Sequence, residues 1–182
     1  GGGSSLQAAL TVVVVDTSLY LLVLFATQGT GVFADLDTGA VALFLLTGVI
    51  GTALARLAIF SGLDRVGASI NTAAVSIRPL FATLLAVVLL DETVGLHTAV
   101  GILVLVVGLV VLAASKGGDV SGWSPRDLLY PILAALFFAI GNVARRYGLV
   151  TFQDVTVLEA VALNEIGGMV VLVAYGAVAG RR

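Results

Sequence analysis

The chain has 182 residues, of which 59% are hydrophobic and 11% are charged, and its mean hydropathy is +1.14. Soluble domains carry roughly a quarter charged residues, so this composition excludes an ordinary soluble fold. A formal net charge of −2 provides no basic surface for nucleic acid, and the lack of cysteine excludes disulfides and thiolate metal sites.

Taken in chain order, the apolar residues form blocks close to the ~20 residues that a helix needs to cross a bilayer. The blocks are continuously apolar rather than alternating, which favours helices over barrel strands. The segments between them are short and rich in Gly, Pro and charge, and Pro125 with Asp127 is typical of a helix start. The predicted transmembrane helices are 6–27, 39–61, 67–90, 97–114, 127–149 and 156–179. The fold class is therefore all-α, a polytopic helical membrane protein with about six transmembrane helices.

The first and last predicted helices resemble each other. LQAALTVVVVDTSLYLLV and LEAVALNEIGGMVVLV both begin Leu-(Gln/Glu)-Ala and become wholly apolar in their second half. Chance similarity between apolar segments is the alternative. A true repeat with an odd number of helices per period would be inverted, as in many secondary transporters.

Arg78 lies near the centre of the predicted helix 67–90, and Pro79 follows it. An ionisable residue at this depth costs roughly 2.5–3.5 kcal/mol on insertion scales, and a mid-helix proline removes a backbone hydrogen bond. The pair predicts a fixed positive charge beside a helix break, where transporters place substrate sites. Such a charge favours an anionic or carbonyl-bearing ligand, and Ser76 and Asn71 add polar groups to the same helix. The alternative is an arginine paired with an acid to hold helices together.

Asp16 is central in the predicted helix 6–27, and Tyr20 shares its face four residues later. One hypothesis makes Asp16 a proton-coupling carboxylate, and the other makes it a counter-ion for Arg78 or Arg56. A proton carrier must take up and release a proton near the working pH, whereas a close arginine stabilises the ionised form. The two roles compete, and both stay open.

The last predicted helix carries Asn164 and Glu165 in its first half. In the ungapped register of the two similar helices, Glu165 falls three residues before the position of Asp16, so both acids could occupy one face. Arg56 lies close enough to the end of its helix for its side chain to reach the interface, so a structural role is at least as well supported. Asn142 can hydrogen-bond across helices and is a candidate cavity residue.

The stretch from Arg56 to Ala114 resembles the signature half of an EamA-type repeat of the drug/metabolite transporter superfamily. The features that carry the resemblance are the turn GLDRVGAS, Pro79-Leu80, the acid pair Asp91-Glu92 closing that helix, and the spaced glycines Gly101 and Gly108. The residues alone predict that these two glycines pack within the bundle, with a homodimer face as the alternative.

The resemblance implies ten helices in two inverted five-helix repeats (5+5), a central cavity and alternating access. Residues 1–118 would then be a first repeat without its first helix, and 119–182 the start of the second, so that the chain resembles a fragment. Arg78 occupies the position where the family's cavity wall is expected, whereas Asp16 matches no family signature. The resemblance also implies that the first helix starts outside the cell. The Lys and Arg count of the loops favours the opposite orientation, which therefore stays open.

The sequence thus predicts a secondary transporter in the cell (plasma or inner) membrane for a small metabolite or drug-like solute, anionic or amphipathic. Proton coupling is an option, and no cofactor or metal is expected. The alternative is a non-transporting membrane subunit or scaffold. An intramembrane enzyme is disfavoured because His97 is the one histidine and no HExxH motif is present. The candidate substrate or coupling residues are Arg78, Asp16, Tyr20, Asn71, Ser76, Pro79, Asn142, Asn164, Glu165 and Arg56.

Overall fold

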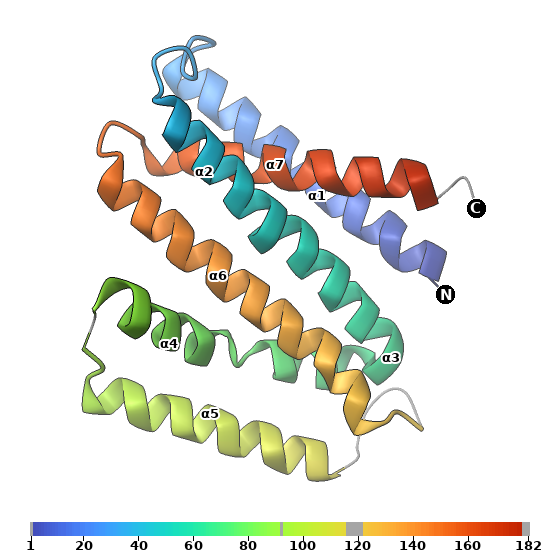
Figure 1. Cartoon of the computed structure of the whole chain (residues 1–182). Coiled ribbons are helices and arrows are strands. Elements are labelled where there is room, and N and C mark those ends of the chain that lie inside the picture. The colour runs from blue at the N-terminus through green and yellow to red at the C-terminus, as the bar shows by residue number, and fades with distance from the viewer. Residues whose placement is uncertain (1, 92, 116–121, 180–182) are drawn as a thin grey trace.

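In the computed structural model the described residues are 2–91, 93–115 and 122–179, and their secondary structure is entirely helical (Figure 1). In chain order the elements are α1 (Gly2–Gln28), α2 (Thr38–Gly48), the π-helical turn η1 (Val49–Leu54), α3 (Ala55–Val75), α4 (Arg78–Leu90), α5 (Leu96–Ser115), the 3-10 turn η2 (Pro125–Leu128), α6 (Leu129–Thr151) and α7 (Val157–Ala179). The predicted all-α class is confirmed.

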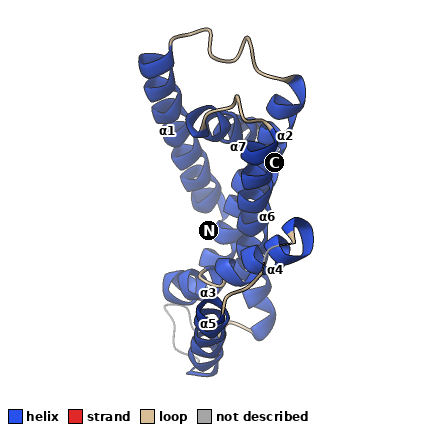
Figure 2. Cartoon of the chain, turned by 90° about the vertical axis from the view of Figure 1, so that its left-hand side faces the viewer, coloured by secondary structure: helices blue, strands red, loops and turns tan. Residues whose placement is uncertain are grey.

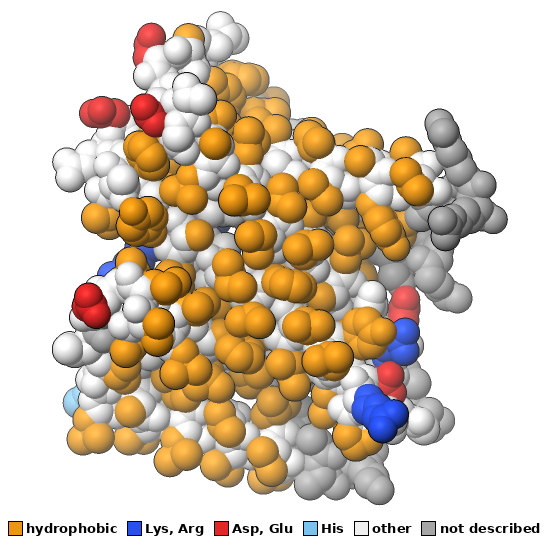
Figure 3. Space-filling view, in the orientation of Figure 1, with side chains coloured by type: hydrophobic (Ala, Val, Ile, Leu, Met, Phe, Trp, Pro, Cys, Tyr) orange, Lys and Arg blue, Asp and Glu red, His pale blue; other side chains and the backbone are white. Residues whose placement is uncertain are grey.

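The described residues include four helical stretches that are long and apolar enough to cross a membrane. They are Leu6–Gln28, Thr38–Val75, Pro125–Thr151 and Val157–Val178, and two shorter apolar helices are Arg78–Leu90 and Leu96–Val111. Figure 3 shows apolar side chains over the middle of the visible face and charged side chains at its margins. This distribution is expected when helices cross a bilayer and their ends reach water, and it confirms a polytopic membrane protein.

The helix that begins at Thr38 continues through η1 and most of the predicted loop GLDRVG, and then turns back at Gly67 (Figure 1). Gly67 has φ 80° and ψ 169°, a conformation essentially restricted to glycine. The predicted loop was therefore too long, because a single glycine makes the turn. The longer helix also places Arg56 deeper in the bundle than the predicted end at residue 61 implied.

The return segment is broken in its middle, as the Arg78-Pro79 pair predicts. Helix α3 ends at Val75 and α4 begins at Arg78. Between them the Ser76 N–H donates to the carbonyls of residues 72 and 73, and the Ile77 N–H donates to that of residue 74 at 3.3 Å. Pro79 has no N–H to donate, which favours this interruption of the regular ladder.

The helices α1 and α7 lie at one end of the molecule and α5 at the other, with the long helix α2–η1–α3 and α6 between them (Figures 1 and 2). The amide of Gln28 donates to the hydroxyl of Thr156 at 3.3 Å, so α1 ends where α7 begins and the two run in opposite directions. Opposite directions are what inverted repeats require, and the repeat boundaries themselves stay a prediction.

Helix α5 is peripheral and contacts chiefly α3. A Cβ atom added to Gly101 or Gly108 would meet nothing within 4 Å among the described residues. The prediction that these glycines pack inside the bundle is therefore wrong for the described part of the chain. The glycines that do bring helices together lie in α2, η1, α3, α6 and α7.

Candidate functional site

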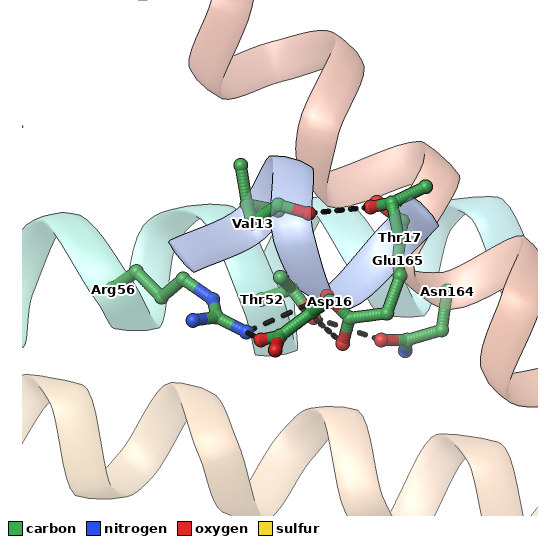
Figure 4. Close-up of polar contacts among 7 residues, drawn as sticks. All are labelled: Val13, Asp16, Thr17, Thr52, Arg56, Asn164 and Glu165. Carbon is green, nitrogen blue, oxygen red and sulfur yellow. Dashed lines mark hydrogen bonds and ion pairs between the residues drawn. The ribbon is translucent and has the colours of Figure 1, made fainter. Parts of the chain in front are cut away.

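Two acids and one arginine from three helices meet near the middle of the bundle (Figure 4). Nη2 of Arg56 in α3 lies 2.6 Å from Oδ2 of Asp16 in α1 and 3.5 Å from Oε2 of Glu165 in α7. The side chains of Arg56 and Glu165 are 17% and 12% exposed, whereas that of Asp16 is 36% exposed. We call Asp16, Arg56 and Glu165 the acid–arginine cluster. With every member ionised, it carries one more negative charge than positive.

A chain of hydrogen bonds continues from Glu165 into the bundle (Figure 4). The hydroxyl of Thr52 lies 2.8 Å from Oδ1 of Asn164 and 3.3 Å from Oε1 of Glu165. Nδ2 of Asn164 donates to the hydroxyl of Thr47 at 2.9 Å, and that hydroxyl donates to a backbone carbonyl of α2 at 2.8 Å. A hydroxyl has one proton, and the shorter distance directs that of Thr52 to Asn164. The carboxylate of Glu165 is thus held loosely, because its 3.5 Å contact with Arg56 is longer than a good hydrogen bond.

Glycines let the helices approach closely enough to form this network. Gly51 in η1 faces Gly141 in α6, and a Cβ atom on Gly51 would lie 2.9 Å from Cα of Gly141. On α7, a Cβ atom on Gly168 would lie 2.5 Å from the methyl carbon of Thr52. The π-helical geometry of η1 occurs at this crossing, and such turns are frequent at functional sites.

A cavity of about 210 Å³ lies beside the cluster, and we call it the central cavity. Five of the predicted site residues line it, namely Arg56, Arg78, Asn142, Asn164 and Glu165. The other lining residues are Gly51, Thr52, Phe138, Gly141 and Arg145. Among these described residues, three guanidinium groups therefore face one carboxylate.

Arg78 reaches the central cavity from the helix break. It is exposed, and its guanidinium carbon lies 5.2 Å from the ring centre of Phe138 on α6, within cation–π range. No carboxylate of the described residues lies within ion-pair distance of Arg78, so the partner of Asp16 is Arg56. Ser76, Arg78, Pro79, Ala82 and Asn142 line an adjoining hollow of about 400 Å³. The geometry thus brings Ser76 and Pro79 next to the central cavity.

Tyr20 and Asn71 lie away from the central cavity. Tyr20 is 40% exposed on α1. Asn71 is 3% exposed, its Oδ1 has no hydrogen-bond partner among the described residues, and it packs near Gly62. Neither residue is among those that line the central cavity.

Sequence reasoning missed Thr52 and Arg145. A threonine in an apolar helix lowers hydropathy little, so nothing in the sequence singles out Thr52 from other hydroxyl residues. Arg145 looks interfacial because it precedes Arg146 near a helix end. In the structure its Nη2 donates to Oδ1 of Asn142 at 2.8 Å, and the residue lines the central cavity.

The arrangement is suited to holding an anion. The described residues contain no group of three or more His, Cys, Asp and Glu side chains that could hold a metal ion. Guanidinium groups bind carboxylates and other oxyanions through charge-assisted hydrogen bonds. The two acids, Asp16 and Glu165, both face the guanidinium of Arg56.

The model of the EamA-like transporter family matches residues 4–114, which is more than half of the chain. The matched stretch runs from α1 almost to the end of α5 and includes Arg56 and Arg78. Comparison with curated proteins gives no match.

Proposed function

We propose that this chain, which belongs to the EamA-like transporter family, carries the solute-binding site of a secondary transporter in its central cavity. The family is one of membrane transporters rather than enzymes. The observation that carries the proposal is the central cavity, which gathers polar side chains from η1, α3, α4, α6 and α7. Polar groups are costly in lipid, and their convergence on one cavity is expected for a solute path.

The composition of the lining favours a small anionic or amphipathic solute. Three guanidinium groups and one carboxylate line the cavity, and Arg56 is already paired with Asp16. Arg78 and Arg145 therefore supply the donors for a ligand with negative charge or several acceptor oxygens. The volume of about 210 Å³ is below the roughly 300–1,000 Å³ of typical ligand pockets. It therefore supports a small metabolite, and Phe138 offers an apolar surface for the uncharged part of an amphipathic one.

Proton coupling fits Glu165 better than Asp16. The short contact with Asp16 holds the guanidinium of Arg56 in place, whereas the longer contact with Glu165 can be exchanged. If Glu165 takes up a proton, the cluster becomes neutral, and the side of the Arg56 guanidinium that faces Glu165 becomes available to the negative group of a solute. This exchange would link proton movement to solute binding.

Alternating access is supported by the broken segment between α3 and α4, where the chain can bend beside Arg78. It is also supported by the opposite directions of α1 and α7, which an inverted repeat requires. We place the transporter in the cell membrane as part of the same proposal. A homodimer through the uncovered glycine face of α5 is the corresponding proposal for its assembly.

The alternative is a non-transporting membrane subunit, and the acid–arginine cluster favours it. In such a protein every buried charge would be paired, as Asp16 and Arg56 are. Arg78 distinguishes a transporter from a subunit. Its side chain faces the central cavity, and it forms no ion pair with any described acid.

The test is uptake of radiolabelled organic anions by the protein reconstituted in liposomes, with Arg78→Ala compared with the unchanged protein. Loss of a charge-assisted contact of roughly 1.5–3 kcal/mol predicts uptake lower by about tenfold or more. Leu84→Ala is the matched control, because Leu84 lies on the same helix with 54% exposure. A subunit would instead show no uptake in any form, and Arg78→Ala would impair its assembly.

A further inference from the structure

A second cavity, of about 310 Å³, lies toward the C-terminal ends of α4 and α6, and we call it the outer cavity. Its polar lining residues are Thr83, Thr93, Thr98, Asn142 and Arg146. The cavity borders the connection between α4 and α5, because Thr93 of that connection lines it. The outer cavity is therefore placed between the helix ends and the interior of the bundle.

The outer and central cavities both adjoin the 400 Å³ hollow at the helix break. Arg78 and Asn142 line both the central cavity and the hollow. Ala82 and Asn142 line both the hollow and the outer cavity. Because Asn142 borders all three, they lie in a row along α4 and α6. We call this row the α4–α6 groove.

The charged groups along this groove are mainly guanidinium groups, which only donate hydrogen bonds. Arg145 and Arg146 bring guanidinium groups from α6, and Arg78 brings a third from α4. Asn142 accepts from Arg145 through its Oδ1, which leaves the hydrogens of its Nδ2 for another acceptor. Among the described lining residues, Glu165 at the inner end is the one carboxylate.

The opposite face of the α4–α6 contact has a different character. There a hollow of about 400 Å³ is lined by Leu85, Leu89, Leu90, Ile140, Val143, Ala144 and Tyr147. Leu90 and Val143 border both this hollow and the outer cavity, so they form the wall between the two faces. An apolar hollow suits lipid chains, whereas guanidinium and amide donors in lipid would lack partners. The polar groove is thus the face that water and solute would occupy.

We propose that the α4–α6 groove is the route by which a small anionic solute reaches the central cavity, with a staging site at Thr83, Asn142 and Arg146. This inference rests on the proposed function and adds the path and an outer binding site to it. A carboxylate or other oxyanion moving inward would pass from Arg146 to Asn142 and then to Arg78. At each step the groove offers another hydrogen-bond donor, so the anion does not lose all of its hydrogen bonds at one time.

The absence of cysteine from the sequence allows a test that does not require the solute to be known. Single cysteines are introduced as Thr83→Cys in the groove and Leu89→Cys on the apolar face of the same helix, where Leu89 is 65% exposed. The protein is reconstituted in liposomes and treated with the anionic reagent sulfonatoethyl methanethiosulfonate or its cationic trimethylammonium counterpart. Each rate is normalised to that of a free thiol with the same reagent.

The expected result for Thr83→Cys is a normalised rate roughly tenfold or more higher with the anionic reagent, as in a cleft of one charge sign. Arg146→Gln or Arg78→Gln in the same background should reduce this preference. Leu89→Cys should react slowly with both reagents, because neither enters lipid. Ala82→Cys serves as a second groove position if the first variant does not fold.

A cysteine at Thr83 that reacts with neither reagent, or equally with both, would overturn the route. If that happened while Arg78→Ala still abolished uptake, the central site would stand and the route alone would fail. If the anion preference were found without any uptake, the groove would stand as an anion-accessible site and the transport function would fail.

Discussion

Arg56 is surrounded by more negative charge than it can balance. Its guanidinium faces Asp16 at 2.6 Å and Glu165 at 3.5 Å, and its Nε–H has no hydrogen-bond partner among the described residues. A buried charge without a partner costs several kcal/mol, so the pairing with Asp16 is needed merely to keep the arginine inside the bundle. The looser contact with Glu165 is the one that a bound solute or proton can replace at small cost.

The short ion pair predicts that Asp16 and Arg56 are strongly coupled in their effect on the free energy of unfolding. We expect Asp16→Asn and Arg56→Gln each to lower the free energy of unfolding by roughly 1–3 kcal/mol, because each removes the 2.6 Å ion pair between these two side chains. The double variant should cost less than the two single effects added together. Thermal unfolding of the four proteins in detergent measures the coupling.

The matched control for this cycle is the pair Arg65 and Asp127, whose atoms are 3.4 Å apart and whose side chains are 48% and 22% exposed. An exposed pair couples by about 1 kcal/mol or less. Additive effects at Asp16 and Arg56, equal to those of the control pair, would mean that their ion pair does not hold the cluster together.

At the scale of residues, the sequence predicts the acid–arginine cluster and Arg78 because an acid or arginine in an apolar block is conspicuous, whereas Arg145 near a helix end was missed. It does not predict which acid meets which arginine, since partners depend on helix rotation and depth. The misplaced helix end at residue 61 made Arg56 look interfacial, although the helix continues to the turn at Gly67. Hydroxyl groups such as that of Thr52 give no comparable signal.

Among the elements, the long helix α2–η1–α3 forms the centre of the bundle because its glycine surfaces admit two neighbours. Gly51 meets Gly141 of α6, and Thr52 meets Gly168 of α7. These contacts join backbone directly to backbone or to a short side chain. The cavity residues on α6 and α7 are therefore positioned by close packing rather than by loops.

A comparison of two glycines tests this packing. A Cβ atom at Gly141 would lie 2.6 Å from Cα of Gly51, and backbone cannot move aside as a flexible side chain can. We expect Gly141→Ala to destabilise the protein by about 1–3 kcal/mol through overpacking. The measurement is the same thermal unfolding in detergent.

Gly108→Ala is the control for that substitution. Gly108 has nothing within 4 Å of an added Cβ atom, and alanine favours a helix by about 0.5–1 kcal/mol over glycine. The control should therefore be neutral or slightly stabilising. Equal destabilisation at both positions would show that the crossing at Gly51 is not as close as described.

The sequence predicts the helical elements well because hydropathy and length determine which stretches can cross a bilayer. The capping box of Ser124 and Asp127 at the start of η2 confirms the predicted helix start there. The π-helical turn could not be predicted, because the sequence VIGTAL has no local signature for it. It forms where two helices press against the same stretch, which is a tertiary effect.

For the whole molecule, two contacts between helix ends assign the connecting segments to two opposite ends. The bond between Gln28 and Thr156 brings residues 29–37 and 152–156 together. The ion pair between Arg65 and Asp127 brings the turn at Gly67 and η2 together at the other end. An experiment that measures on which side of the membrane each end lies therefore tests the path of the chain.

We expect single cysteines introduced as Gly31→Cys, Gly95→Cys and Gln153→Cys to be labelled from one side of sealed vesicles. Arg126→Cys should be labelled from the other side, because α6 lies between residues 126 and 153 and crosses the membrane. An impermeant maleimide, added before or after lysis, provides the measurement. Labelling of Gly31→Cys and Gly95→Cys from opposite sides would contradict the return of the chain at Gly67.

The same labelling decides between the two orientations that the sequence left open. Arg145 and Arg146 line the central and outer cavities, so they are poor markers of a cytoplasmic loop. Without them the Lys and Arg count rests on residues at the end that holds Arg65 and Arg126. The family resemblance puts that end outside, and the count puts it inside.

The break at Ser76 and Ile77 also has a mechanical consequence. An unbroken helix resists bending because its hydrogen bonds must stretch, but here the regular ladder is already interrupted. We therefore expect helix α4, with 13 residues, to tilt as a rigid body about this break. At 1.5 Å per residue it is roughly 20 Å long, so a tilt of about 10° would move its far end by roughly 3 Å. Arg78 lies next to the break, where the displacement would be smallest, and Leu90 at the far end of α4 would move furthest.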